Sequence, residues 1–329
     1  MIQEYKKRSC IGQFFAAVKD GTKLILYLTV ILSVSYFFYY MFHDFVMSIL
    51  LKNTAKETRI CGTGRHECLA PFRKQSPLIY VSPQHKLATF AIHKNIGNMT
   101  KGTMCYLFDQ QLSTSDFPTF EDYAGSLECW ENATNFYSDF DSLLFDYPDF
   151  NQDPEWKLFI LTRDPIERLI NGYVDKCHRN PPELPQCGSD FSEFISNLHK
   201  HLLKASDGIE PIPTDIFIQN FSPQTWQCDF QRTFRKLIPI KYSSEPGKEA
   251  RFFEDFTNLL KSAKVSKADL DYITNQFTTK NSKESKINTS EMVHSVTAEL
   301  MGNQKLLKKV IQVYFYDFVL LGYHFPIEY

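Results

Sequence analysis

Two short stretches, far apart in the chain, share one pattern: an apolar run, a polar turn and then a helix start. In the first, the run from Ala88 to Ile92 is followed by His93-Lys94-Asn95-Ile96-Gly97-Asn98-Met99-Thr100. In the second, the run from Leu158 to Thr162 is followed by Arg163-Asp164-Pro165 and a helical pattern to Tyr173. A buried strand that enters a helix N-terminus presents unpaired backbone N–H groups and the positive end of a helix dipole, which favours an anion. With Lys94 and Arg163 as fixed cations, the two turns predict a site for a ligand with two phosphate groups.

Apolar runs at 78–81, 88–92, 158–162 and 236–241 predict buried strands that alternate with helical stretches. This order indicates an α/β fold with a parallel sheet flanked by helices. Pro165 at the first or second helical position marks a helix start. Segment 116–155 has no clear period and is interpreted as loops and short helices. After residue 245 the pattern is helical. An apolar stripe at helical spacing is expected to pack into the core, and it consists of Phe252, Phe253, Phe256, Leu259 and Leu260.

The two turns resemble the 5′-phosphosulfate and 3′-phosphate loops of the Golgi carbohydrate sulfotransferases. The chain is most similar to the chondroitin/dermatan/HNK-1 branch, in a divergent form that resembles nematode members. The matches at family spacing are Arg163, Pro165, Arg168, Leu169, Gly172, Tyr173, Pro223-Gln224, Trp226, Cys228, Tyr314, Asp317-Phe318 and Leu321-Gly322-Tyr323. The resemblance covers residues 78–325. The chain departs from it at Asn171, where the family usually has a phosphate-binding serine, at Asn220, where relatives often have histidine, and in a first loop without the commoner Pro-Lys pair.

The resemblance implies a P-loop-like sulfotransferase core and 3′-phosphoadenosine 5′-phosphosulfate as co-substrate, with no metal. Lys94 is expected to stabilise charge on the oxygen that bridges sulfur to the departing nucleotide, and His93 is the second catalytic candidate. The predicted donor-binding residues are Lys94, Asn95, Ile96, Gly97, Asn98, Met99, Thr100, Arg163 and Asn171. A base must accept the proton of the acceptor hydroxyl. The candidates are His85, His93, His178, Glu121 and Asp122.

The predicted reaction is transfer of a sulfuryl group to a hydroxyl of a glycan, with a chondroitin-type chain and 4-O-sulfation favoured by the resemblance. No nucleic-acid partner is predicted. A catalytically silent relative that binds nucleotide or glycan is the alternative, and an unrelated membrane-anchored binding protein is a third reading. The chain has no G-x-x-x-x-G-K-[ST], no G-x-G-x-x-G after a strand and no G-x-S-x-G. Nucleotide hydrolysis, dinucleotide redox chemistry and serine hydrolysis therefore lack their usual motifs.

The uncharged run from Leu24 to Phe42 spans roughly 30 Å as a helix, the thickness of a bilayer core. It predicts a retained transmembrane anchor, with a buried core helix or a cleaved signal peptide as alternatives. More basic residues precede the run than follow it, which favours a cytoplasmic N-terminus. The predicted organisation is a tail over 1–23, an anchor over 24–42, a lumenal stem over 43–77 and a catalytic domain over 78–329. We expect a single-pass type II protein of the Golgi membrane.

Sequons and cysteines agree with a lumenal domain. The sequons begin at Asn98, Asn132, Asn220 and Asn288, and Asn132 and Asn288 are the better acceptors because a glycan on Asn98 would block the first turn. Seven of the eight cysteines follow the anchor. An oxidising compartment favours disulfides, and an odd number leaves at least one thiol unpaired within the chain. Cys61–Cys68 and Cys177–Cys187 are the local pairings to test first, and no zinc-finger spacing is present.

The domain has no excess of positive charge. The tail through Lys23 carries a net charge of +3, which leaves −5 for the rest of a chain with a total of −2. A polyanionic glycan would therefore need a local basic patch.

Overall fold

The computed structural model describes residues 58–62, 67–73, 78–109, 119–125, 129, 135–178, 184–206, 216–243, 248–278 and 291–327. The chain divides into two units, Met1–Arg59 and Ile60–Tyr329, and nearly all described residues belong to the second.

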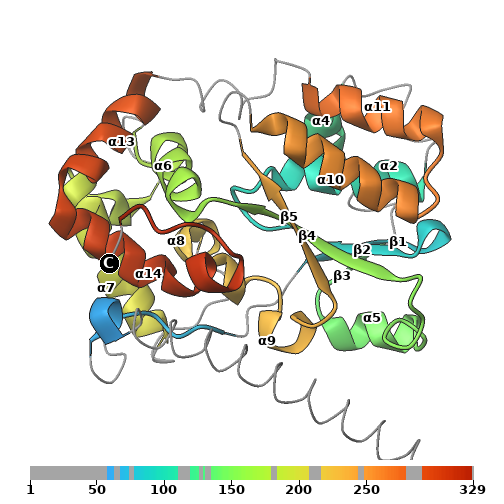
Figure 1. The fold of residues 1–329 in the computed structure, drawn as a ribbon, viewed down its shortest axis with the longest axis horizontal. Coiled ribbons are helices and arrows are strands. Elements are labelled where there is room, and N and C mark those ends of the chain that lie inside the picture. Colours follow the sequence, from blue (N-terminus) through green and yellow to red (C-terminus); the bar gives the residue numbers. More distant parts are fainter. Residues whose placement is uncertain are drawn as a thin grey trace, which may run out of the picture. The chain divides into compact units, whose positions relative to one another are not determined.

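A five-stranded sheet forms the centre of the described part of this unit, with strand order β3-β1-β2-β4-β5 (Figure 1). The strands are β1 (Ile79–Ser82), β2 (Leu87–Phe90), β3 (Phe136–Tyr137), β4 (Lys157–Arg163) and β5 (Leu237–Tyr242). The four strands predicted from apolar runs are thus confirmed within about two residues. β3 was missed because it is a single pair of residues, too short to show a period.

The sheet is mixed, which corrects the prediction of a parallel sheet. β2 runs parallel to β4, and β4 runs parallel to β5, but β1 is antiparallel to both β2 and β3. Only the 3-10 turn η1 (Pro83–His85) and Lys86 separate β1 from β2. This connection is too short for the crossover that parallel neighbours require. Connection length, not strand composition, sets the direction of β1.

Helices cover both faces of the sheet, and a group of helices lies beyond the carboxyl end of β4 (Figure 1). The helices are α2 (Gly97–Phe108), α4 (Phe120–Gly125), α5 (Phe140–Asp146), α6 (Pro165–Lys176), α7 (Phe191–Ser206), α8 (Ile216–Phe221), α9 (Phe230–Thr233), α10 (Glu249–Ser262), α11 (Lys267–Thr278), α13 (Glu291–Gly302) and α14 (Gln304–Leu320). Two further 3-10 turns are η3 (Pro185–Cys187) and η4 (Gln224–Trp226).

Successive residues of β4 point to different hydrophobic cores, as the pleat of a strand requires. Phe159 and Leu161 belong to a core with residues of α2, α10 and α11, whereas Leu158 and Ile160 belong to one with residues of α5 and α9. A third core joins α6, α7, α8, α13 and α14. The predicted stripe on α10 packs into the first of these cores, with Phe253 half-buried and its other members buried.

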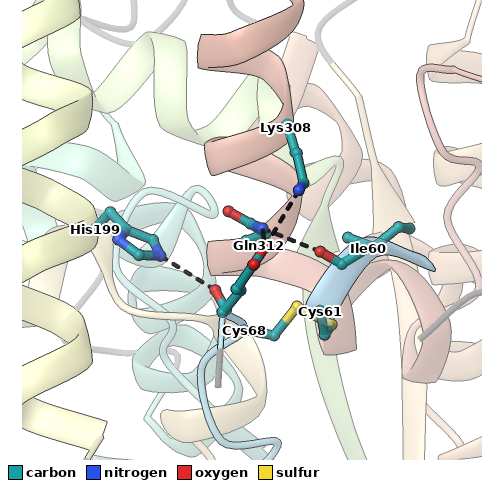
Figure 2. Close-up of a disulfide and its surroundings, with 7 residues drawn as sticks. Ile60, Cys61, Cys68, His199, Lys308 and Gln312 are labelled. Atoms are coloured by element: carbon teal, nitrogen blue, oxygen red, sulfur yellow. Dashed lines mark hydrogen bonds and ion pairs between the residues drawn. A yellow bond between two sulfur atoms is a disulfide. The ribbon is translucent and has the colours of Figure 1, made fainter. Parts of the chain in front are cut away.

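Residues 60–62 and 67–70, which the sequence assigns to a stem, pack against α14 (Figure 2). Gln312 of α14 donates from Nε2 to the Ile60 carbonyl at 3.0 Å and to Glu67 Oε2 at 2.6 Å. Trp226 Nε1 donates to the Ala70 carbonyl at 2.7 Å. This segment is therefore part of the same folded unit as the sheet.

Three disulfides are present among the described residues. Cys61–Cys68 and Cys177–Cys187 confirm the two local pairings expected from the sequence, and Cys105–Cys129 is a third that was not predicted. Cys228 is buried and carries no disulfide, in agreement with the odd number of cysteines after residue 42.

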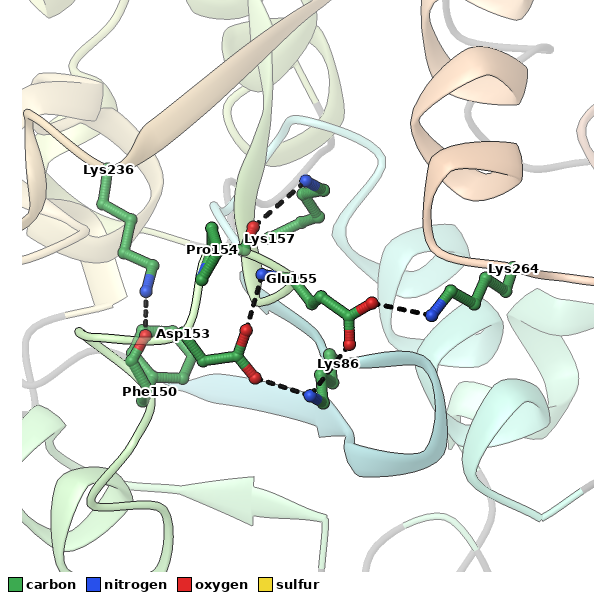
Figure 3. Close-up of polar contacts among 8 residues, drawn as sticks. All are labelled: Lys86, Phe150, Asp153, Pro154, Glu155, Lys157, Lys236 and Lys264. Carbon is green, nitrogen blue, oxygen red and sulfur yellow. Dashed lines mark hydrogen bonds and ion pairs between the residues drawn. The ribbon is translucent and has the colours of Figure 1, made fainter.

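A polar network ties the amino ends of the parallel strands together (Figure 3). Lys86, just before β2, contacts Asp153 at 2.5 Å and Glu155 at 3.0 Å. Glu155 also binds Lys264 at 2.7 Å. Lys236, just before β5, donates to the Phe150 carbonyl and lies 4.3 Å from the centroid of the Phe150 ring. These ion pairs occupy the end of the sheet opposite the two cation-bearing turns.

Within the residues that the structure describes, no helix is long and apolar enough to cross a membrane. The run from Leu24 to Phe42 lies outside those residues, so the anchor stays a prediction.

Candidate active site

The first turn lies between β2 and α2 and has an unusual backbone. Lys94 and Ile96 adopt φ = 65° and φ = 50°, values that are uncommon for residues other than glycine. Gly97 has no such φ, but a Cβ on it would lie 3.2 Å from the Ile92 carbonyl oxygen. Gly97 therefore permits a close approach of the chain to the Ile92 carbonyl that a side chain would crowd, while Lys94 and Ile96 carry the left-handed conformation.

Helix α2 begins at this turn without a side-chain cap on its N-terminus. The N–H groups of Gly97, Asn98 and Met99 occupy the first turn, where no intrahelical acceptor exists. Thr100 is buried, and its Oγ1 donates to the Ile96 carbonyl at 3.1 Å. Of the groups expected to bind an anion, the N–H groups of Gly97, Asn98 and Met99 lie at the helix start, whereas the Asn95 N–H donates to the Ile92 carbonyl at 3.2 Å and the Thr100 hydroxyl is used inside the helix.

The second turn lies between β4 and α6 and is capped by its own carboxylate. Asp164 Oδ1 accepts from the N–H groups of Ile166 at 2.9 Å and Glu167 at 3.1 Å. Pro165 occupies the first helical position, as the sequence predicts. Because Asp164 uses the N–H groups of the first turn, an anion near β4 must be bound by side chains rather than by the start of α6.

Arg163 ends β4 with its side chain fully buried. The guanidinium donates from Nε and Nη2 to Glu167 Oε1 at 3.0 and 2.9 Å, and it lies 5.4 Å from the centroid of the Tyr242 ring. Its Nη1 donates to the Lys94 carbonyl at 3.4 Å. The two cation-bearing turns, 69 residues apart in sequence, therefore meet at one place.

Gln224 joins the same two turns from a third segment. Its Oε1 accepts from Asn95 Nδ2 at 2.5 Å and from the Arg163 N–H at 3.0 Å, while its Nε2 donates to the Arg163 carbonyl at 2.9 Å. Asn95 Nδ2 also donates to the Leu161 carbonyl at 2.9 Å. Asn95, predicted as a ligand through its backbone, thus has a buried side chain that fastens the first turn to β4.

Two further matches of the sequence pattern support these loops: Arg168 contacts the first turn, and Asp317 contacts the segment of Gln224. Arg168 donates to the carbonyls of His93 at 3.0 Å, Ser222 at 2.8 Å and Asn220 at 3.1 Å, and burial lowers the pKa of its guanidinium. Asp317 accepts from the N–H groups of Gln224 at 2.8 Å and Thr225 at 3.0 Å. Burial raises the pKa of Asp317, and these hydrogen bonds act in the opposite direction. The motif residues Arg168, Gln224 and Asp317 therefore position the loops.

Lys94 forms an ion pair with Asp175, a residue that the sequence did not single out. Asp175 lies in the last turn of α6, and the side chains of Lys94 and Asp175 are 19% and 14% exposed. Lys176 Nζ contacts the same carboxylate at 3.6 Å. Nothing in the sequence between positions 94 and 175 indicates this partner, because α6 brings Asp175 to the turn only in the folded chain.

His93 is the base candidate that lies in this site. Desolvation by the surrounding protein, followed by the charges of Arg168 and Lys94, lowers its pKa to about 4, although the residue keeps exposed surface. The backbone N–H of His93 donates to Gln227 Oε1 at 3.2 Å. His93 is thus neutral at pH 7, and the lowered pKa makes it a weaker base than an ordinary histidine.

The structure also describes the side chains of three other base candidates, His85, His178 and Asp122. His85 contacts the Ala263 carbonyl at 3.3 Å and lies before β2, at the opposite end of that strand from Lys94. This placement removes His85 from the site. His178 is exposed just after α6, and Asp122 is exposed on α4, where it contacts Thr119 at 2.6 Å. The side chain of Glu121 lies outside the described residues.

Asn171 faces inward from α6 and is 5% exposed. Its Nδ2 donates to the Glu167 carbonyl at 2.8 Å, and its buried Oδ1 has no hydrogen-bond partner. One of the two N–H groups of this amide is thus used within α6, and the atom without a partner is an acceptor.

The chain is similar in sequence to proteins of the nematode Caenorhabditis elegans. An uncharacterized Caenorhabditis elegans protein, C18B2.2, is 29% identical over 296 residues, which cover 86% of this chain and 78% of that protein. The putative sulfotransferase vep-2 of the same species is 28% identical over 230 residues, covering 68% and 70%. The carbohydrate sulfotransferase chst-1, also from C. elegans, is 20% identical over 292 residues, covering 83% and 82%. No solved structure gives a significant match.

The model of the sulfotransferase family matches residues 77–324, a range that includes every strand of the sheet and both cation-bearing turns. The chain therefore belongs to the sulfotransferase family.

Proposed function

We propose that this protein transfers a sulfuryl group from 3′-phosphoadenosine 5′-phosphosulfate to a hydroxyl of a glycan. The acceptor we propose is a chondroitin-type chain, which becomes sulfated at a 4-hydroxyl. The observation that carries the proposal is the meeting of the two turns, where the Arg163 guanidinium contacts the Lys94 carbonyl at 3.4 Å. A ligand with phosphate groups at two positions needs two such sites at a fixed separation. The buried Gln224 side chain binds both turns, through Asn95 and Arg163, and so fixes their separation.

In this proposal the first turn binds the 5′ group of the donor, and Arg163 with Asn171 binds the 3′-phosphate. The N–H groups of Gly97, Asn98 and Met99 face the anion at the uncapped start of α2. Arg163 is suited to a phosphate because a guanidinium donates two parallel hydrogen bonds. Asn171 takes part through the second N–H of its Nδ2, because the first donates to the Glu167 carbonyl.

The transfer itself needs positioning and charge stabilisation. The acceptor oxygen attacks sulfur, the bond between sulfur and the bridging oxygen breaks, and the proton of the acceptor hydroxyl passes to a base. Lys94 stabilises the charge on the departing oxygen, and His93, neutral at pH 7, is the proposed base. The products are the sulfated glycan and 3′,5′-bisphosphoadenosine.

The proposed acceptor and cellular location are supported by a relative and by the disulfides. Chst-1 is described as a carbohydrate sulfotransferase, and its 20% identity favours a glycan acceptor. Three disulfides favour an oxidising compartment. Together with the apolar run at 24–42 and the sequons, they support a Golgi membrane protein with a lumenal catalytic domain.

The test uses full-length protein in detergent. Isothermal titration with 3′,5′-bisphosphoadenosine measures donor-site binding, and a radiolabelled donor measures transfer to a panel of desulfated glycosaminoglycans. Binding with transfer to desulfated chondroitin is the expected result. Binding without transfer to any glycan favours the catalytically silent relative, for which the substitution at Asn171 is the motivation. Absence of binding contradicts the proposal.

A further inference from the structure

Both cations of the site are paired with carboxylates of one helix. Glu167 in the first turn of α6 accepts two hydrogen bonds from Arg163, and Asp175 in its last turn pairs with Lys94. The side chains of Glu167 and Asp175 are only 12% and 14% exposed. A partly buried cation without a counter-ion destabilises the fold. Both carboxylates therefore stabilise the protein when no sulfuryl donor is bound.

The two pairs differ in how they respond to an incoming anion. Arg163 uses Nε and Nη2 for Glu167, while its Nη1 points to the first turn and contacts the Lys94 carbonyl. A planar guanidinium can hold a carboxylate on one edge and a phosphate on another. Glu167 therefore orients Arg163 and does not compete with the donor.

Lys94 has a single ammonium group, and Asp175 contacts that group directly. An anionic oxygen that approaches the ammonium also approaches the carboxylate. Two like charges this close repel each other more strongly in a partly buried site than in bulk water, because the effective dielectric constant is lower there. Lys176, at 3.6 Å from the same carboxylate, remains as a partner for Asp175 when Lys94 turns away.

We infer that Asp175 is an exchangeable counter-ion of Lys94, which the donor displaces on binding and which recaptures Lys94 when the nucleotide product leaves. This inference rests on the proposed function, because it takes Lys94 as a ligand of the donor. Asp175 acts through Lys94 and lowers the affinity for the bisphosphate product, so it favours product release.

The experiment compares the affinity and dissociation rate of 3′,5′-bisphosphoadenosine for full-length wild type and Asp175→Asn. The variant is expected to bind about fivefold or more tightly and to release the nucleotide correspondingly more slowly. Glu167→Gln is expected to change affinity in the opposite direction, because Arg163 loses its orienting partner. Asp271→Asn, an exposed position on α11, removes the same charge at a distance and should leave affinity unchanged.

A double-mutant cycle separates ion-pair exchange from a general charge effect. In a Lys94→Met background, Asp175→Asn should lose most of its gain in affinity. An equal gain in both backgrounds, or no gain in a folded Asp175→Asn protein, overturns the inference. If Asp175→Asn does not fold, Asp175→Ser provides the same comparison, and Asp175→Glu should keep wild-type affinity. Wild type that fails to bind the nucleotide contradicts the proposed function instead, so the two failures are distinguishable.

Discussion

Gln224 and Arg163 exchange two hydrogen bonds: the Gln224 amide accepts from the Arg163 N–H at 3.0 Å and donates to the Arg163 carbonyl at 2.9 Å. A side chain thus satisfies the backbone of β4 at the point where the chain leaves the sheet. The same amide oxygen accepts from Asn95, so one buried residue fixes the ends of β2 and β4 relative to each other.

Replacement of Gln224 by leucine should destabilise the fold by about 3 kcal/mol or more, because each buried polar group left unpaired costs about 1–3 kcal/mol. Urea unfolding measures the change. Gln304→Leu, at the exposed start of α14, serves as the control and should stay within about 0.5 kcal/mol of wild type. Equal stability of the two variants would show that the Gln224 hydrogen bonds do not stabilise the turns after β2 and β4.

Lys94→Ala should reduce kcat about a hundredfold or more, in line with the loss of a preorganised charge stabiliser. Affinity for 3′,5′-bisphosphoadenosine should change less than tenfold, because Arg163 and the backbone N–H groups remain. Lys94→Arg should not restore turnover fully, since a planar guanidinium cannot occupy the same point. Steady-state kinetics and titration give the two numbers, after circular dichroism has shown folded protein. Near-normal kcat in folded Lys94→Ala would remove Lys94 from the mechanism.

Arg163→Ala should weaken nucleotide binding by roughly tenfold or more, since hydrogen bonds to charged groups contribute about 1.5–3 kcal/mol. The sequence places Arg163 in a turn, which suggests that the variant folds normally. The structure buries the side chain beside Glu167, so the variant should also lose stability. Titration together with thermal unfolding measures both effects.

Asn171→Ser should retain or improve nucleotide binding and should not lower the Tm. Asn171 Oδ1 is buried without a partner, and a serine hydroxyl removes this unpaired acceptor while it keeps a donor for phosphate. A lower Tm combined with weaker binding would show that the asparagine amide has a role that serine cannot fill.

Gly102→Ala should destabilise the protein by about 1–3 kcal/mol through overpacking. A Cβ at Gly102 would lie 2.6 Å from the Phe120 carbonyl oxygen and 2.7 Å from Phe120 Cβ, so α2 and α4 would have to separate. Gly302→Ala is the matched control, because a Cβ there meets nothing within 4 Å. Similar Tm values for both variants would show that α2 and α4 adjust without cost.

Lys101→Met removes a buried cation but also its hydrogen bond to the Ala124 carbonyl, and wild type should gain stability relative to this variant as the pH rises from 8 to about 10.5. Burial lowers the pKa of Lys101 to about 8 in the folded chain, below the ordinary value of lysine. The unfolded state therefore binds more protons in that pH range, and wild-type stability gains from a rise in pH. Lys261→Met, at an exposed position on α10, should show no such trend. Chemical unfolding across this range measures the difference.

The sequence determined features that depend on one segment at a time. Apolar runs located four strands, because strands buried on both faces are built from uninterrupted apolar residues. The edge strand β5 was found in the same way, although Ile238, Pro239 and Lys241 are exposed. Asp164 and Pro165 fixed the start of α6, and the short spacings of Cys61–Cys68 and Cys177–Cys187 made local disulfides the simplest pairings. The positions of Lys94 and Arg163 after apolar runs indicated an anion site before any contact between them was known.

Tertiary structure decided everything that depends on which distant segments meet. The Cys105–Cys129 disulfide and the contacts of Gln224 with both turns follow from the packing of separate elements, which no local period records. The ion pair of Lys94 with Asp175 joins residues 81 positions apart. Periodicity reports how deeply a residue is buried, but the partner of a buried charge is set by the helix that packs beside it.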